Sequence, residues 1–121
     1  MKTSKDPRHL KRIKIIQDLF SWSFSVKKRA PSDIKEIVEH LSEIDSLIEK
    51  SAPNRPLTQI NRIDLAILRN SIFELIIKGD TPPKVVVDEA VELGKEFGSD
   101  STSSFVNGAL GKLIEIKKIR T

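Results

Sequence analysis

The sequence predicts an all-α protein, and two observations lead to this fold class. Apolar residues recur at steps of three and four over most of the chain, which keeps them on one face of a helix. Proline-containing breaks at residues 51–56 (SAPNRP) and 79–83 (GDTPP) separate these stretches, because proline does not continue a helix. No stretch shows the period of two that is typical of a strand. We therefore expect one compact helical domain over residues 1–121.

The helices can be assigned in chain order from their caps and breaks. Asp33 and Glu36 have the spacing of a capping box before an apolar stripe, and Asn61 is suited to cap the helix that follows the first break. Proline after Thr81 is a favoured way to begin a helix, and Gly98 is suited to end that helix. The expected elements are a helix over 8–22, a helix over 34–50, a short turn at 57–60, helices over 62–78 and 82–97, a loop and cap region at 98–104 and a last helix over 105–119.

Composition excludes several classes of protein. The chain has no cysteine, so disulfides, zinc–thiolate sites and thiol nucleophiles are ruled out. No apolar run approaches the roughly 20 residues that span a bilayer, and no signal-peptide core is seen; we expect a cytoplasmic protein without a membrane partner. The two histidines lack metal-ligand or nucleophile spacing, and there is no phosphate-binding glycine loop. The sequence thus predicts a protein that is not an enzyme, with no metal or cofactor.

Charge is distributed unevenly along the chain. Residues 1–30 hold nine Lys or Arg and two Asp, whereas residues 31–52 hold two Lys and six Asp or Glu. A basic end beside an acidic segment suggests two surfaces with two kinds of partner.

The basic end is concentrated at the start of the first helix. Steps of three and four place Lys5, Arg8 and Arg12 on one face, with Lys11 and Lys14 on its flank. Cations at a helix N-terminus oppose the helix dipole, so their presence favours an anionic ligand over a merely solvated end. Nucleic acid is the expected ligand, and the residues alone do not separate RNA from DNA.

Four positions in the second half of the chain are candidates for a functional or packing role. Asp64 is explained by its place in the first turn of a helix, although a protein contact is the alternative. Asn107 is either a core amide or a ligand contact. Gly108 and Gly111 lie inside a helical pattern, where glycine costs about 1 kcal/mol relative to alanine, and core packing is the expected reason for Gly108.

Four segments of the chain resemble the NusB family of bacterial transcription antitermination factors. They are the basic opening with LFSW (19–22), IDLAILRNSIFEL (63–75), DTPPKVVVDEAVELGKEFG (80–98) and FVNGALGKL (105–113). The resemblance implies a fold of two small packed helical bundles without enzymatic activity. It also implies binding of boxA-type single-stranded RNA in nascent ribosomal RNA transcripts, together with the ribosomal protein NusE, within an antitermination complex on RNA polymerase.

The resemblance also assigns residues. The family's basic RNA-binding motif matches Arg8, His9 and Arg12, with Lys5, Lys11 and Lys14 adding charge. Asn107 of FVNG falls near the same RNA surface, and the NusE-facing acidic position falls on Asp64. The chain departs from the family in its short connection over residues 24–32, which predicts a shortened N-terminal bundle. It also departs at Ser104 and Gly111, where the family often has a lysine and an acid.

Another class of function fits the same basic helix. A non-enzymatic protein-interaction module would use these cations to contact an acidic protein. A third interpretation is a helical DNA-binding domain, which predicts tighter binding of duplex than of single-stranded nucleic acid. No recognition helix separate from the basic segment is evident in the sequence.

Overall fold

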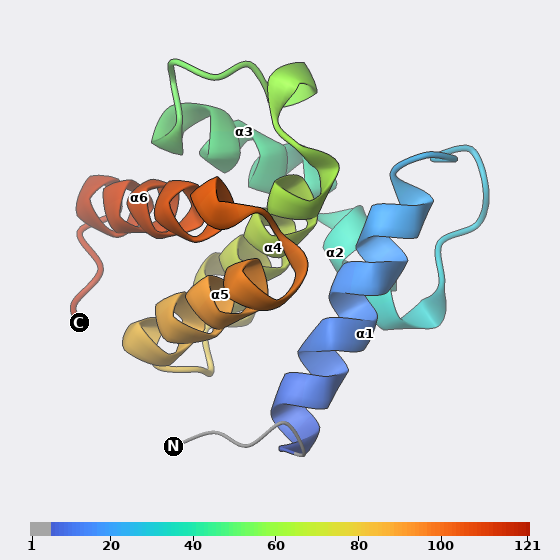
Figure 1. Ribbon diagram of the computed structural model, residues 1–121, viewed down its shortest axis with the longest axis horizontal. Helices are drawn as coiled ribbons and strands as arrows, with labels where there is room; N and C mark the ends of the chain where they lie inside the picture. Colours follow the sequence, from blue (N-terminus) through green and yellow to red (C-terminus); the bar gives the residue numbers. More distant parts are fainter. Residues whose placement is uncertain (1–5) are drawn as a thin grey trace.

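A central helix, α4 (Arg62–Ile72), organises the computed structural model, which describes residues 6–121. Every residue from Asp64 to Ile72 is buried, as expected of a helix that is surrounded by others. α4 packs against α1, α3, α5 and α6, and Figure 1 shows it in the middle of these helices. α4 therefore lies where the first and second halves of the chain meet.

The described chain contains six α-helices, two 3-10 turns and one π-helical segment. No strand occurs in residues 6–121, which confirms the all-α prediction. None of the helices in this range is both long and apolar enough to cross a membrane. Besides α4, the elements are α1 (Pro7–Trp22), α2 (Lys35–Glu39), α3 (Leu41–Ser51), α5 (Pro83–Phe97), α6 (Asp100–Ile116), the 3-10 turns η1 (Ser32–Ile34) and η2 (Leu57–Gln59), and the π-helical segment η3 (Phe73–Lys78).

The N-terminal helices differ from the prediction at two points. The helix expected over 34–50 is two helices, because the backbone at His40 (φ −108°, ψ 15°) leaves the helical region between α2 and α3. The predicted capping box is absent: Ile34 precedes α2, with no side-chain cap. The N-terminal group was predicted to be shortened, and its α2 has only five residues.

The C-terminal helices follow the prediction more closely. Asn61 caps α4 by accepting a hydrogen bond from the Ile63 backbone N–H at 2.8 Å. η3 ends at Gly79, whose φ of 67° suits glycine. α6 begins five residues before the expected start, because Ser99 and Thr102 form a capping box. The segment expected as a loop and cap region thus contains the cap, and its residues from Asp100 onward already belong to α6.

The buried apolar side chains form one core. Side chains of α1, α3, α5 and α6 reach it around α4, and α3 also packs directly on α6. The groups α1–α3 and α4–α6 therefore share their interior within the described residues.

Candidate functional site: the basic start of α1

The first turn of α1 is held by its own cap. Asp6 accepts the Arg8 backbone N–H at 2.9 Å, and this hydrogen bond is the main reason that the pKa of Asp6 is lowered. Pro7 occupies the first helical position, where its fixed φ suits the helix. The helix therefore begins at Pro7 despite the cations that follow.

Three exposed cations follow one another at steps of three along α1, and we call Arg8, Lys11 and Lys14 the cationic flank. The Arg8 side chain is 83% exposed and lies 3.4 Å from Asp6. Lys14 Nζ lies 2.6 Å from Asp18 and 3.2 Å from Asp33, and these carboxylates, Asp18 first, raise the pKa of Lys14. Lys11 is exposed, with no hydrogen bond or ion pair to another described residue. The flank presents three cations to solvent, and pairs between exposed groups contribute little to stability.

Arg12 belongs to a different environment. Its guanidinium donates two hydrogen bonds to Glu74 of η3, from Nε at 2.9 Å and from Nη2 at 2.7 Å. Nη1 lies 3.6 Å from Glu89 of α5, and Glu74 also accepts from Asn70 at 3.0 Å. Both Arg12 and Glu89 are buried. This two-pronged pairing is the strong form of an arginine–carboxylate contact, and it ties α1 to η3.

His9 is also buried between carboxylates. Its Nδ1 lies 3.0 Å from Glu89 and its Nε2 lies 3.1 Å from Glu96, both of α5. Ionised carboxylates only accept hydrogen bonds, so this geometry suits an imidazolium that donates from both nitrogens. The hydrogen bond with Glu89 is the largest cause of a raised pKa at His9, opposed by burial and aided by Glu96.

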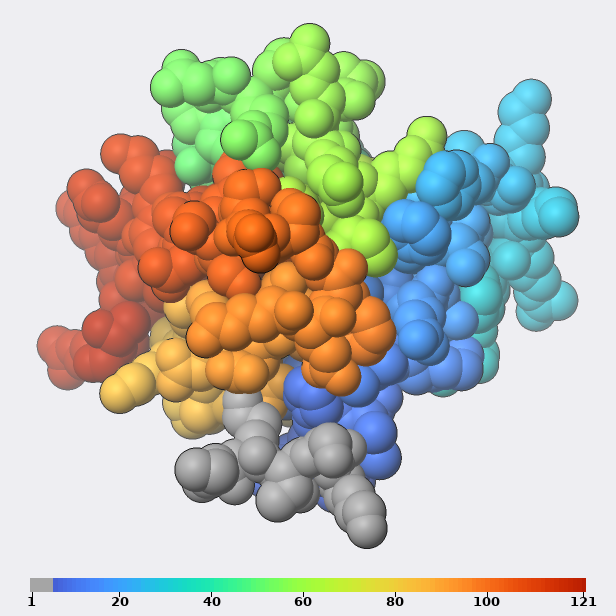
Figure 2. All heavy atoms as spheres, in the orientation of Figure 1, coloured from blue at the N-terminus to red at the C-terminus, as the bar shows by residue number. Residues whose placement is uncertain are grey.

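The structure therefore divides the predicted RNA-binding cations into two sets. The prediction that Arg12 shares an exposed face with Arg8 is wrong: Arg12 and His9 lie on the buried stripe that continues through Ile16 and Leu19. Lys5 lies outside the described residues. Figure 2 shows α1 (blue) at one side of the surface, next to α5 and the start of α6 (orange).

The carboxylates that pair with these cations were missed from the sequence. Glu74 lies inside the apolar run IFELII and Glu89 lies beside Ala90 on the inward face of α5. An acid within an apolar stripe signals a buried charge, which requires a partner. The sequence contains this signal but does not identify the cation that pairs with each buried acid.

Asp64 and Asn107 lie apart from the cationic flank. Asp64 is 4% exposed and accepts a hydrogen bond from Thr102 Oγ1 at 2.7 Å, which links the first turns of α4 and α6. The expected NusE contact at Asp64 therefore rests on the resemblance alone. Asn107 is exposed on α6, so it is not a core amide, and α6 packs mainly on α3, α4 and α5.

Gly108 does not have the packing role that was expected. It is exposed, and a Cβ added there would have no atom within 4 Å. Core packing therefore does not explain this glycine, and the same space is open at Gly111.

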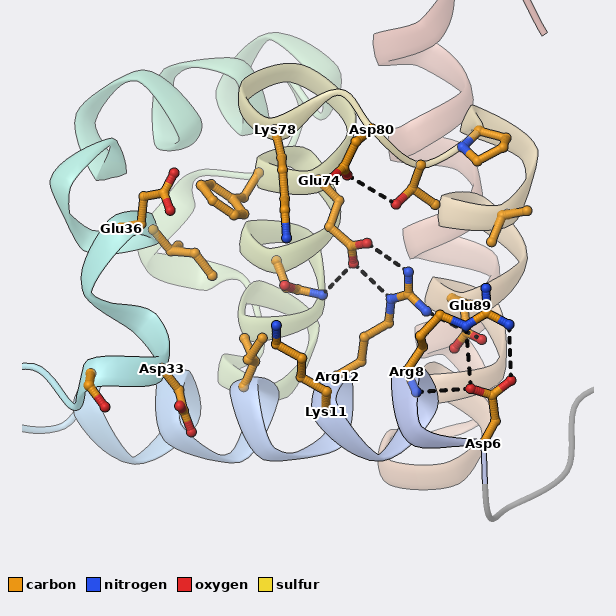
Figure 3. Close-up of a pocket in the computed structure, with 18 residues that line it drawn as sticks. Asp6, Arg8, Lys11, Arg12, Asp33, Glu36, Glu74, Lys78, Asp80 and Glu89 are labelled. Atoms are coloured by element: carbon orange, nitrogen blue, oxygen red, sulfur yellow. Dashed lines mark hydrogen bonds and ion pairs between the residues drawn. The ribbon is translucent and has the colours of Figure 1, made fainter.

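A cavity of about 750 Å³ opens beside the cationic flank. It lies between α1, η3, the start of α5 and the η1–α2 segment, and Figure 3 shows Arg8, Lys11 and Lys78 among its lining side chains. In the described part of the chain, no group of three or more His, Asp or Glu side chains could hold a metal ion. The charged and polar side chains at this site can make ionic contacts and hydrogen bonds with a ligand.

The fold places the chain in the class of small all-helical NusB-type proteins. The structure titled "T. maritima NusB, P3121, Form 2" matches with a TM-score of 0.82 and 28% identity, over 95% of this chain and 93% of that one. A solution structure of NusB from Aquifex aeolicus matches with a TM-score of 0.75 at 22% identity, over 94% of this chain and 93% of that one. Both matches take in nearly the whole chain.

The NusB family model matches residues 25–115, so the chain belongs to the NusB family. The transcription antitermination protein NusB of Myxococcus xanthus is 45% identical over 102 residues, 77% of this chain and 73% of the relative. The protein of the same name from Chloroflexus aggregans is 53% identical over 78 residues, 63% of this chain. The chain spans about half (52%) of that relative's length.

Proposed function

We propose that this protein is a transcription antitermination factor that binds boxA-type single-stranded RNA of nascent ribosomal RNA transcripts together with NusE. The observation that carries the proposal is the cationic flank, three exposed cations in a row on a helix whose buried side is fixed to the core. Phosphate contacts supply most of the affinity of such surfaces, and a rigid helix sets the register in which the RNA lies. Membership of the NusB family supports the same role.

The two sets of cations on α1 have different tasks in this proposal. Arg8, Lys11 and Lys14 contact phosphates, and the bases stay free for edge or stacking contacts, as in other single-stranded RNA sites. His9 and Arg12 act as positioning residues, because their partners on α5 and η3 hold the helix in place. Asn107, exposed on α6, is a second RNA contact that rests on the resemblance.

The proposed partners are NusE and the antitermination complex on RNA polymerase, in the cytoplasm. Asp64 is buried against Thr102, so a role in NusE binding would be to fix the relation of α4 and α6. The surface of those helices would then make the direct contact.

The test is fluorescence anisotropy with a boxA-type RNA and a scrambled control, with and without NusE, at 50 and 200 mM salt. If the cationic flank neutralises three phosphates, the slope of log affinity against log salt is about −2, which is roughly a 20-fold loss over this range. We expect tighter and sequence-selective binding when NusE is present. Equal binding of both RNAs, unaffected by NusE, would contradict the antitermination role.

A charge-reversal variant separates RNA binding from contact with an acidic protein. Arg8→Glu with Lys11→Glu should abolish RNA binding and leave NusE binding intact. Loss of NusE binding with unchanged RNA binding would favour the protein-interaction module instead.

A further inference from the structure

The cavity beside the cationic flank has an apolar lining with charged groups at fixed places. Ile15 of α1, Ile37 of α2, Phe73 of η3 and Val85 of α5 contribute apolar surface. Lys11 and Lys78 reach into the same space from α1 and η3, and Glu36 faces it from α2 (Figure 3). Four separate elements thus converge on a space of about 750 Å³, which is within the usual range of small-molecule sites.

The charges in the cavity disfavour a phosphate inside it. Arg8 and Arg12 line the cavity but are already paired, with Asp6 and with Glu74 and Glu89. Lys11 and Lys78 have no carboxylate partner in the described chain, and Glu36 and Asp80 line the same space without a cation partner there. The remaining charges therefore balance, two cations against two carboxylates. A neutral group with donors and acceptors on its edge fits such a lining better than an anion does.

A nucleobase has this chemistry. Its faces are apolar enough to pack on isoleucine, valine and phenylalanine side chains, and its edge carries amino, imino and carbonyl groups. A carboxylate accepts from an exocyclic amine, as acidic side chains do from the N4 of cytosine. Lysine ammonium groups donate to ring nitrogens and carbonyl oxygens. A single-stranded RNA can turn one base out of its stack to make such contacts.

We propose that this cavity is a base-binding subsite, which receives one unstacked base from an RNA whose phosphates lie on the cationic flank. Glu36 accepts a hydrogen bond from the exocyclic amine, Lys78 donates to an acceptor of the base, and Val85 forms part of the rim, while Lys11 keeps its phosphate contact on the cationic flank. The subsite selects a base that carries an amine, such as cytosine, over uracil. This inference rests on the proposed RNA-binding function.

Homopolymer binding tests the subsite directly. Anisotropy is measured with 12-nucleotide oligo(C) and oligo(U) at one salt concentration, with the full chain alone and with NusE. The wild-type protein should bind oligo(C) about fivefold or more tightly than oligo(U), the lower end expected for a good base contact. Phosphate contacts alone would give the two RNAs equal affinity, so equal binding with a normal salt slope would overturn the subsite and leave the proposed function standing.

Two variants with matched controls test whether the cavity is the source of the preference for oligo(C) over oligo(U). Glu36→Ala removes the acceptor and should bring the oligo(C) to oligo(U) ratio close to one, whereas Glu39→Ala, at an exposed residue of α2 that does not line the cavity, should retain it. Val85→Trp should block the rim and weaken oligo(C) several-fold. Ile116→Trp changes a residue of similar exposure on α6, 41% against 39% for Val85, and should have no effect.

The outcomes are distinguishable. A cytosine preference that both cavity variants remove and both controls keep supports the subsite. A preference that survives Glu36→Ala and Val85→Trp places base recognition elsewhere and overturns the subsite. Failure of the wild-type protein to bind either homopolymer or boxA RNA, even with NusE, would sink the proposed function itself.

Discussion

The two sides of α1 carry cations in opposite circumstances. Arg8, Lys11 and Lys14 are exposed, and carboxylates near them are local or on the surface. His9 and Arg12 are buried against carboxylates from η3 and α5. Residues that look equivalent in a basic segment therefore do different work: one set is available to an anionic ligand, and the other holds the helix that presents it.

Removal of the Arg12 side chain should give the largest difference in stability between the two sides of α1. Arg12→Ala leaves Glu74 without its buried cation and removes one cation from Glu89, which keeps His9, so the free energy of unfolding should fall by about 3–5 kcal/mol. Lys11→Ala, one residue earlier on the exposed side, should change it by about 0.5 kcal/mol or less. Urea denaturation measures both. If Arg12→Ala does not fold, Arg12→Lys should show an intermediate loss, since the charge remains and the two-pronged geometry does not. Equal stabilities of the Arg12 and Lys11 variants would contradict the division.

Removal of the cationic flank should have the converse effect. The triple variant Arg8→Ala, Lys11→Ala, Lys14→Ala should lose the roughly 20-fold salt dependence of RNA binding between 50 and 200 mM, because each phosphate contact contributes about 0.7 to the slope. Its midpoint of urea unfolding should stay close to that of the wild type. A control that removes the exposed Lys35, Lys50 and Lys95 makes the same change in net charge and should keep the slope. If both triple variants lose it, general charge rather than α1 governs binding.

The pH dependence of stability should reveal the buried histidine. The pKa of His9 is raised in the folded state, chiefly by Glu89, so His9 stabilises the fold below the unfolded-state pKa of about 6.5. This contribution is lost as the pH rises through the higher folded-state pKa. Each unit of elevation corresponds to about 1.4 kcal/mol.

Denaturation curves between about pH 6 and pH 9 measure this effect against the reference value for histidine. The wild-type free energy of unfolding should fall with rising pH, and His9→Gln should be flatter. His40→Gln changes the other histidine, whose Nδ1 lies 2.9 Å from the Glu36 backbone carbonyl oxygen and whose ring faces Phe73, and is the matched control. A His9→Gln variant with an unchanged slope would place the titration elsewhere.

The smallest expected effect is that of a glycine substitution on α6. It tests whether a change in stability there is accompanied by a change in RNA binding. Gly108→Ala should raise the free energy of unfolding by about 0.5–1 kcal/mol, because alanine favours the helix and the space is open. Gly98→Ala is the opposite case, since its Cβ would collide with Thr102, and should destabilise the protein. Thermal unfolding measures both. If Gly108→Ala also weakens RNA binding, the RNA reaches the α6 surface next to Asn107; unchanged affinity would confine it to α1.

Local signals predicted much of the fold. The Asn61 cap, the start of α5 at its prolines and the turn at η2 all appear as expected, because each depends on neighbouring residues. The break at His40 was missed, since the apolar stripe of α2 and α3 continues through it. The early start of α6 was missed because its cap residues, Ser99 and Thr102, also favour loops.

The sequence by itself determined the helices and the concentration of cations on α1, because helical spacing and charge are properties of adjacent residues. Only the tertiary structure decided which of those cations is free. The partner of Arg12 lies 62 residues further along the chain and that of His9 lies 80 residues further. A helix has the same periodicity whichever side it buries, so the packing of α1 against α4, α5 and η3 selects the face that meets these carboxylates and leaves the cationic flank to solvent.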